Sequence, residues 1–256
     1  MLIRTSLLAA VAIAAGFLSP ISSDGAAAAE VKTVVLVHGS WADGSSWSKV
    51  IPLLEAKGLH VVAVQNPLSS LADDVAATNR AIDLQTGPVV LVGHSWGGVV
   101  ISQAGNNDKV AALVYVSAFA PDSGQSINDL LNGLPDPPYL ATLIKDSAGY
   151  LYLPSDSISQ YFAQDLAKSE QEILTVTQGP WFYGCLADKV TQSAAHAKPS
   201  WWVLSEQDRI IDPRLQMAMA TAIHAHITSV PTSHVSMLAA PEAVARVILD
   251  AVKHAE

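Results

Sequence analysis

The chain has 256 residues, half of them hydrophobic and only 14% charged, which predicts one folded domain with a full core and excludes a disordered protein. A formal net charge of −9, with no basic patch, argues against binding to nucleic acid or anionic lipid. The single cysteine, Cys185, excludes an internal disulfide and has no neighbouring base in the sequence, so we expect a small buried hydrophobe.

The first 29 residues have the pattern of a secretory signal peptide. Arg4 precedes an apolar stretch at 6–18, and small residues at 26–29 suit cleavage. The apolar stretch is shorter than the ~20 residues of a membrane span. We therefore expect a signal peptide at 1–29 and a secreted or periplasmic mature protein with no stable membrane association. An uncleaved N-terminal anchor is the alternative.

Apolar runs alternate with segments of helical spacing along the rest of the chain. Such alternation predicts an α/β fold, with a mostly parallel sheet of about six strands covered by helices on both faces. A continuous apolar run also predicts a strand that is buried on both faces. The predicted strands are 33–37, 61–64, 88–92, 110–116, 201–204 and 227–230, and the predicted helices are 47–56, 70–85, 96–104, 213–222 and 243–252.

The alternation of apolar runs and helical segments stops between about 121 and 199, where prolines and an Asn-Gly pair at 132–133 separate short segments. Two of these segments, 158–168 and 170–176, have helical character. We predict that this stretch is a helical cap inserted into a single domain that covers 30–256.

Residues 88–100 predict a strand, a sharp turn and a helix, with Gly-His-Ser-Trp-Gly-Gly at 93–98. A serine becomes a nucleophile when its hydroxyl is held clear of the backbone beside a base. Gly93 and Gly97 leave room for a strained turn that presents Ser95, and Gly98 lets the following helix pack closely. The alternative is a glycine-rich turn with an incidental serine.

Ser95, Asp208 and His234 follow one another in the order of an α/β-hydrolase triad, and the last two stand just after predicted strands. We expect His234 to take the proton of Ser95 and Asp208 to orient the imidazole. Glu206, nearer the strand, and Asp212, a better helix cap, are rival acids. Backbone N–H groups supply the expected oxyanion hole.

Two motifs place that oxyanion hole and carry a family resemblance. Residues 37–41, Val-His-Gly-Ser-Trp, together with Gly44, Trp47 and Lys49, resemble the oxyanion loop of the methylesterase and hydroxynitrile-lyase branch of the α/β-hydrolase superfamily, and residues 93–98 resemble its nucleophile elbow. Residues 162–166 and 206–213 are similar to bacterial esterase-like members. The oxyanion donors are then the backbone N–H groups of Ser40 and Trp96.

This resemblance implies the α/β-hydrolase fold, a helical lid, no cofactor and a small-molecule ester substrate. The lyase members resemble one another in an oxyanion-loop threonine and a lysine soon after the histidine. This chain has Gly39 in the oxyanion loop and Val-Ser-Met at 235–237 after the histidine. The lysine that would assist acid-base chemistry in a lyase is therefore missing from these positions.

The function we predict is a serine hydrolase that cleaves a small carboxylic ester through an acyl-enzyme. The alternatives are a ligand-binding protein with little or no turnover, a hydroxynitrile-lyase-like enzyme, and an amide- or lactone-cleaving relative. No metal site is expected, because no cysteine or carboxylate cluster accompanies His224 and His226. The oligomeric state stays open. The aromatic residues that suit an acyl pocket, or equally the core, are Tyr139, Tyr161, Trp181 and Phe182.

Overall fold

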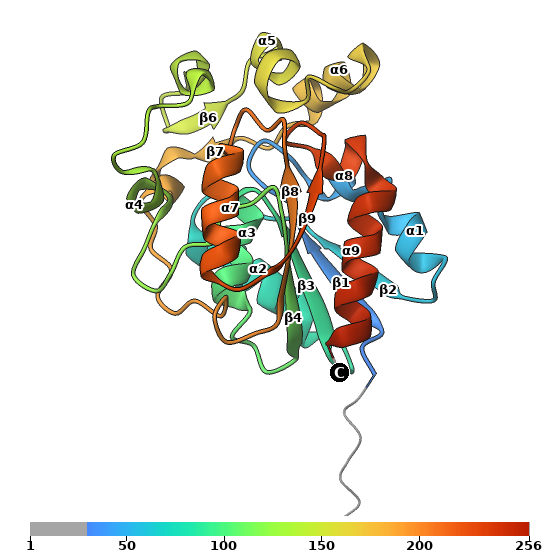
Figure 1. Cartoon of the computed structure of the whole chain (residues 1–256). Helices are drawn as coiled ribbons and strands as arrows, with labels where there is room; N and C mark the ends of the chain where they lie inside the picture. The colour runs from blue at the N-terminus through green and yellow to red at the C-terminus, as the bar shows by residue number, and fades with distance from the viewer. Residues whose placement is uncertain (1–29, 256) are drawn as a thin grey trace, which may run out of the picture.

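The computed structural model describes residues 30–255, and the predicted signal peptide at 1–29 lies outside them (Figure 1). Within this range a parallel sheet stands at the centre, helices cover both of its faces, and a cap lies over one end (Figure 1). None of the helices in this range is long and apolar enough to cross a membrane.

The central sheet has six strands in the order β2-β1-β3-β4-β8-β9, and every neighbouring pair is parallel. Its strands are β1 Thr33–Val37, β2 His60–Val64, β3 Val89–His94, β4 Val110–Val116, β8 Ser200–Ser205 and β9 His226–Val230. The inner strands are runs of buried, mostly β-branched residues, as expected for strands covered on both faces. The predicted α/β architecture, a parallel sheet of six strands, is confirmed.

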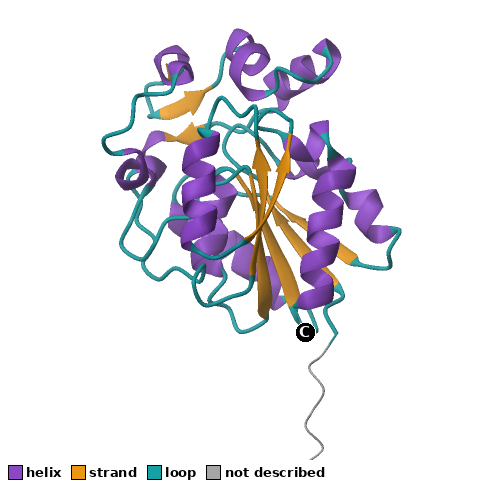
Figure 2. Ribbon diagram, in the orientation of Figure 1, coloured by secondary structure: helices purple, strands orange, loops and turns teal. Residues whose placement is uncertain are grey.

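The helices are divided between the two faces of this sheet (Figure 2). One face carries α1 Ile51–Glu55 and α9 Pro241–His254, with the short α8 Ser236–Ala239 beside α9, and the other carries α2 Leu71–Asp83, α3 Trp96–Ala104 and α7 Pro213–Ala222. Ser70 caps α2 by accepting from the N–H of Asp73, and Asp212 caps α7 ahead of Pro213. Both starts match the capping signals in the sequence.

Two predictions for the first part of the chain were wrong. The helix expected at 47–56 is a 3-10 turn, Gly44–Trp47, followed by α1, which begins at Ile51. Pro52 explains the later start, because a proline fits only the first turn of a helix. The strand expected to be buried at 61–64 is β2 at the sheet edge, where only Val64 is buried.

The segment between β4 and β8 forms the cap, which contains strands that the sequence did not predict. β5 Ile144–Lys145, β6 Tyr150–Tyr152 and β7 Trp181–Phe182 make a small antiparallel sheet. The helical pieces are α4 Ile127–Leu131, the 3-10 turns Pro138–Thr142 and Tyr183–Leu186, α5 Ser155–Ser157, a π-helical turn Ile158–Phe162, and α6 Lys168–Thr177.

The helix predicted at 158–168 was therefore wrong, since helical structure stops at Phe162 and resumes at Lys168. Ala163, at φ −140°, leaves the helical region while its N–H still donates to the carbonyl of Ile158. The segment predicted at 170–176 lies inside α6.

Because all six strands are parallel, their carboxyl ends meet at one edge, which the cap covers (Figure 1). The loops after β1, β3, β8 and β9 carry the residues singled out in the sequence. The chain reverses its direction of growth between β1 and β3, and ligands of open parallel sheets bind at such a point.

Candidate active site

Ser95 occupies the turn between β3 and α3 with a strained backbone. Its φ of 53° is rare for a residue with a side chain. The glycines around it have no room for a Cβ, which would lie 2.5 Å from the Gly97 carbonyl oxygen at Gly93 and 2.5 Å from the Val37 carbonyl oxygen at Gly97. The turn can therefore form only with glycine at these two positions.

The loop after β1 lies directly against this turn. A Cβ at Gly39 would lie 2.6 Å from the Cβ of Ser95 and 2.9 Å from the carbonyl oxygen of His94. Neither the N–H of Ser40 nor that of Trp96 donates to another described residue.

His38 fixes this loop through hydrogen bonds that require a neutral imidazole. Its Nδ1 donates to the carbonyl of Gly39 at 2.9 Å, while its Nε2 accepts from the N–H of Asn66 at 2.9 Å. The Asn66 side chain also donates to the His38 carbonyl at 3.0 Å. Burial lowers the pKa of His38, which agrees with the neutral form.

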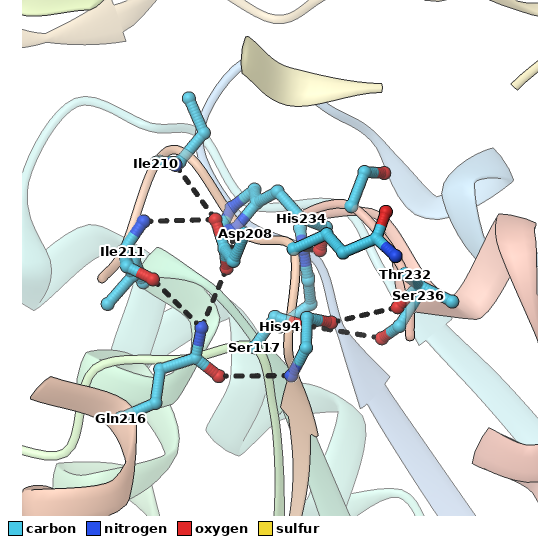
Figure 3. Close-up of polar contacts among 12 residues, drawn as sticks. His94, Ser117, Asp208, Ile210, Ile211, Gln216, Thr232, His234 and Ser236 are labelled. Atoms are coloured by element: carbon cyan, nitrogen blue, oxygen red, sulfur yellow. Dashed lines mark hydrogen bonds and ion pairs between the residues drawn. The ribbon is translucent and has the colours of Figure 1, made fainter. Parts of the chain in front are cut away.

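Asp208 and His234 come together at the carboxyl ends of β8 and β9 (Figure 3). The Nδ1 of His234 lies 2.8 Å from Oδ2 of Asp208, and both side chains are fully buried. The other carboxylate oxygen accepts from the N–H groups of Ile210 at 2.8 Å and Ile211 at 3.0 Å. These bonds stabilise the charged carboxylate and fix its orientation toward the imidazole.

Gln216 completes the surroundings of the carboxylate and was missed in the sequence. Its Nε2 donates to Oδ2 of Asp208 at 2.8 Å, the same oxygen that faces His234, and to the carbonyl of Ile211 at 3.0 Å (Figure 3). A signal was present, because Gln216 shares a helical face with Met219 and Ala220, which are buried. A polar residue on the buried face of a helix needs a partner.

The two rival acids lie elsewhere. Glu206 is exposed on the loop after β8. Asp212 accepts from the N–H of Arg214 at 2.8 Å and pairs with the Arg214 guanidinium. Of the three carboxylates after β8, only that of Asp208 contacts His234.

The far side of the His234 ring is buried without a partner. Its Nε2 makes no hydrogen bond to any described residue. The ring of His94, the residue before Ser95, lies 4.7 Å from the His234 ring, and His94 Nε2 donates to the His234 carbonyl at 3.0 Å. Burial, and then the neighbouring His234, hold the pKa of His94 well below its usual value. Ser95 itself is 3% exposed and has no hydrogen bond to His234.

The cap contacts the loops that carry His234 and Asp208. The ring of Phe162 lies 5.2 Å from the ring of His234. Asp165 accepts from the N–H of Ser233 at 2.7 Å, and Gln164 donates to the carbonyl of Gln207 at 2.7 Å. The cap thus binds the backbone beside both Asp208 and His234.

Tryptophan side chains fill the space under the cap. Trp181 lies 5.5 Å from both Trp41 and Trp96 in ring centroid distance, and Trp41 also meets Tyr139 edge-on at 6.0 Å. The Trp96 indole donates to buried Asp74 at 2.7 Å, and burial raises the pKa of that carboxyl to about 6. Two of the predicted pocket residues, Tyr139 and Trp181, therefore pack in this cluster.

The remaining two predicted pocket residues lie apart from the tryptophans. Phe182 packs against Tyr150 and Tyr183. Tyr161 lines a cavity of about 720 Å³ between the cap and the loop that carries Asp208. Among residues 30–255 no group of three histidine, cysteine or acidic side chains is placed to hold a metal.

Comparison with known proteins adds a matching family, two relatives in sequence and one similar solved structure. The model of the alpha/beta hydrolase family matches residues 34–247. Probable hydrolase R7 from Phoma sp. is 24% identical over 239 residues, which is 85% of this chain and 96% of that protein. Methylesterase 8 from Arabidopsis thaliana is 36% identical over 107 residues, which is 36% of this chain and 39% of that protein. The crystal structure of polyneuridine aldehyde esterase superposes with a TM-score of 0.75 at 21% identity, covering 86% of this chain and 99% of that one.

Proposed function

This chain belongs to the alpha/beta hydrolase family, and we propose that it is a serine esterase that cleaves a small carboxylic ester through an acyl-enzyme. The proposal rests on one observation above all, the buried contact of 2.8 Å between Asp208 and His234 with the opposite nitrogen of the ring left without a partner. A buried polar atom without a hydrogen-bond partner calls for an explanation. A catalytic base at His234 Nε2, which accepts a proton during the reaction, supplies one.

Each residue then has one role. His234 Nε2 takes the proton of the Ser95 hydroxyl as its oxygen attacks the ester carbonyl carbon, and returns it to the leaving alcohol. The backbone N–H groups of Ser40 and Trp96 bind the oxyanion that forms. Asp208 holds the imidazole in the required tautomer and stabilises its positive charge. Water then attacks the carbonyl carbon of the acyl-enzyme while His234 takes its proton. The acid is released as the Ser95 oxygen leaves and regains a proton from His234.

The esterase names among the similar proteins agree with this reaction class. Methylesterase 8 matches over the segment of 107 residues, and the chain spans about two fifths of its length. Its substrates are therefore not carried over. The fold likeness to polyneuridine aldehyde esterase supports the architecture alone.

The lyase alternative is disfavoured by the contact at Gly39. A threonine there would place its Cβ 2.6 Å from the Cβ of Ser95, so this loop has no space for the lyase-like residue. In the ligand-binding alternative Ser95 is present but no ester is turned over. The experiment below distinguishes this alternative from an esterase.

The test is labelling with a fluorophosphonate, read by intact mass and peptide mapping, beside turnover of p-nitrophenyl acetate. We expect one label on Ser95 and turnover that Ser95→Ala abolishes without loss of fold. The exposed Ser48 provides the matched control, since Ser48→Ala removes the same hydroxyl outside the site. Turnover retained by Ser95→Ala refutes the nucleophile, and labelling without turnover favours the binding protein.

The same assay identifies the acid. Asp208→Asn leaves the shape of the pair intact but removes the charge, and we expect kcat to fall at least about 10³-fold. Asp212→Asn changes a helix cap paired with Arg214 and leaves kcat close to that of the wild type. A larger loss in Asp212→Asn assigns the acid to Asp212.

We also propose that the mature protein is secreted or periplasmic after cleavage near residue 29. Sequencing of the N-terminus of the exported protein tests this, and an intact Met1 in the membrane fraction contradicts it.

A further inference from the structure

The buried carboxylate of Asp74 lies behind the proposed nucleophile turn and has no role in the reaction described above. Asp74 belongs to α2, which packs against α3, and its side chain and that of Trp96 are both buried. Its Oδ2 accepts from the indole N–H of Trp96 at 2.7 Å, and its Oδ1 accepts from the backbone N–H of Leu68 at 2.8 Å. One carboxylate therefore holds the residue after Ser95 and the loop between β2 and α2.

Both segments that this carboxylate holds contain a strained backbone. Leu68 has φ 60° and Ser95 has φ 53°, and such values are rare for residues with a side chain. Strained conformations cost free energy and persist only where surrounding contacts fix them. For Leu68 the contact is direct, because its own N–H donates to Asp74. For Ser95 the anchored group is the side chain of the next residue, Trp96.

Trp96 connects the buried carboxylate to the proposed oxyanion hole. Its backbone N–H is one of the two proposed donors, and its ring is bonded to Asp74 and packed against Trp181 at 5.5 Å. Trp181 belongs to β7, in which Phe182 donates its N–H to the Leu68 carbonyl at 2.9 Å. Asp74 thus fixes the Trp96 ring directly and, through Leu68, supports the cap strand that packs on the same ring.

We propose that Asp74 is a positioning residue, which through the indole of Trp96 keeps the backbone N–H of Trp96 aimed at the developing oxyanion. This proposal rests on the proposed serine esterase function. An oxyanion donor stabilises the transition state more than the bound ester, so its displacement lowers kcat and leaves KM nearly unchanged. Removal of such a donor costs about 10²–10³ in kcat, and a donor that is displaced but still present should cost at least about tenfold.

Two variants break the bond from opposite sides. Trp96→Phe removes the indole N–H and keeps both the backbone donor and the bond between Asp74 and Leu68. Asp74→Asn keeps an oxygen for the Leu68 N–H and turns its amide N–H toward the indole N–H, so that two donors face each other. In the double variant this conflict between donors is absent.

Two further variants are matched controls. Trp201→Phe removes the indole bond of 2.8 Å to Asp250, at the opposite end of β8 from the acid loop, and Asp73→Asn changes the exposed carboxylate next to Asp74. The fold of each purified mature protein is checked by urea titration. kcat and KM are measured with p-nitrophenyl acetate above neutral pH, where the Asp74 carboxyl is ionised because its pKa is about 6.

The inhibition constant of trifluoroacetone measures the oxyanion hole separately from substrate binding. The Ser95 oxygen adds to the ketone carbon, the hydroxyl proton passes to His234, and the carbonyl oxygen becomes an oxyanion in the hole. We expect Trp96→Phe and Asp74→Asn to lower kcat and to raise this constant at least about tenfold, with KM within about twofold of the wild type. The double variant should lose no more than the slower single variant, because both changes act on one bond. Both controls keep the wild-type values.

Several outcomes overturn the proposal. They are a wild-type kcat in either single variant, a loss that appears in KM alone, an unchanged inhibition constant, and losses that multiply in the double variant. Unfolding of both single variants without urea also overturns it, because Asp74 then serves the fold alone. Failure of the esterase function looks different, because the wild type then turns over no ester and Ser95 is not labelled.

Discussion

Replacing Gln216 by methionine tests how strongly the carboxylate of Asp208 depends on its side-chain donor. Gln216 is fully buried, and its Nε2 bridges Asp208 Oδ2 at 2.8 Å and the Ile211 carbonyl at 3.0 Å. Methionine has a similar length and is apolar and flexible, so it fills the same space without donating. The substitution therefore removes these hydrogen bonds, and the one at 3.4 Å that Gln216 Oε1 accepts from the Ser205 N–H, with little change in packing.

The expected loss follows from the partners that remain. A hydrogen bond to a charged group contributes about 1.5–3 kcal/mol. Asp208 keeps the N–H groups of Ile210 and Ile211 and the ring of His234, so the lower part of this range applies. A loss of about 1.5–2 kcal/mol lowers kcat by about tenfold to thirtyfold. KM should stay unchanged, because Gln216 acts through Asp208 and lies outside the substrate path.

The split between kcat and KM, measured beside a urea titration, distinguishes a role in positioning the acid from a general loss of stability. A positioning role lowers kcat at constant KM while the protein stays folded under the conditions of the assay. The matched control is Gln103→Met on α3, whose side chain accepts from Thr191 far from the site. A rise in KM that accounts for the loss, or a fall in kcat no larger than in Gln103→Met, refutes this reasoning.

Two further predictions concern the nucleophile turn and the carboxyl below it. Gly39→Ala should lower kcat at least 100-fold, because its Cβ would lie 2.6 Å from the Cβ of the proposed nucleophile; Gly87→Ala, in open space, is the control, and equal activities contradict the prediction. Burial raises the pKa of Asp74 from 3.8 to about 6, so the folded state binds this proton more tightly than the unfolded state. Relative to Asp74→Asn, the free energy of unfolding should fall by roughly 2 kcal/mol from pH 4 to 7, and an equal change in both proteins by urea titration contradicts this.

The sequence predicted the parts of the site that depend on local pattern. The strands of the central sheet are continuous apolar runs, and the residues that follow them meet at one edge because the strands are parallel. The order of Ser95, Asp208 and His234 could therefore be read before their contacts were known. The choice among Asp208, Glu206 and Asp212 stayed open in the sequence, although Asp212 carries a helix-capping signal that the structure shows in use.

Other parts depend on contacts between distant segments. Trp181 in β7 pairs with Leu151 in β6, thirty residues earlier, and a strand of two residues has no period to detect. The π-helical turn before Ala163 likewise ends where the cap docks on the histidine loop, with Phe162 on His234. Local propensity carries no information on either contact.

Of the aromatic residues that suit an acyl pocket or equally the core, Tyr139 and Trp181 pack in the tryptophan cluster and Tyr161 lines the cavity. Large rings placed beside a nucleophile pack against one another, as Trp41 and Trp181 do, because burying them stabilises the fold more than lining a void. Space remains instead where packing is prevented. α4 ends at Leu131, ahead of Gly133 at φ 81°, and the cavity-lining prolines at 135, 137 and 138 in the loop that follows fix their own φ angles and cannot donate. The proline cluster, used in the sequence only to delimit the cap, is therefore the local signal that best marks the cavity.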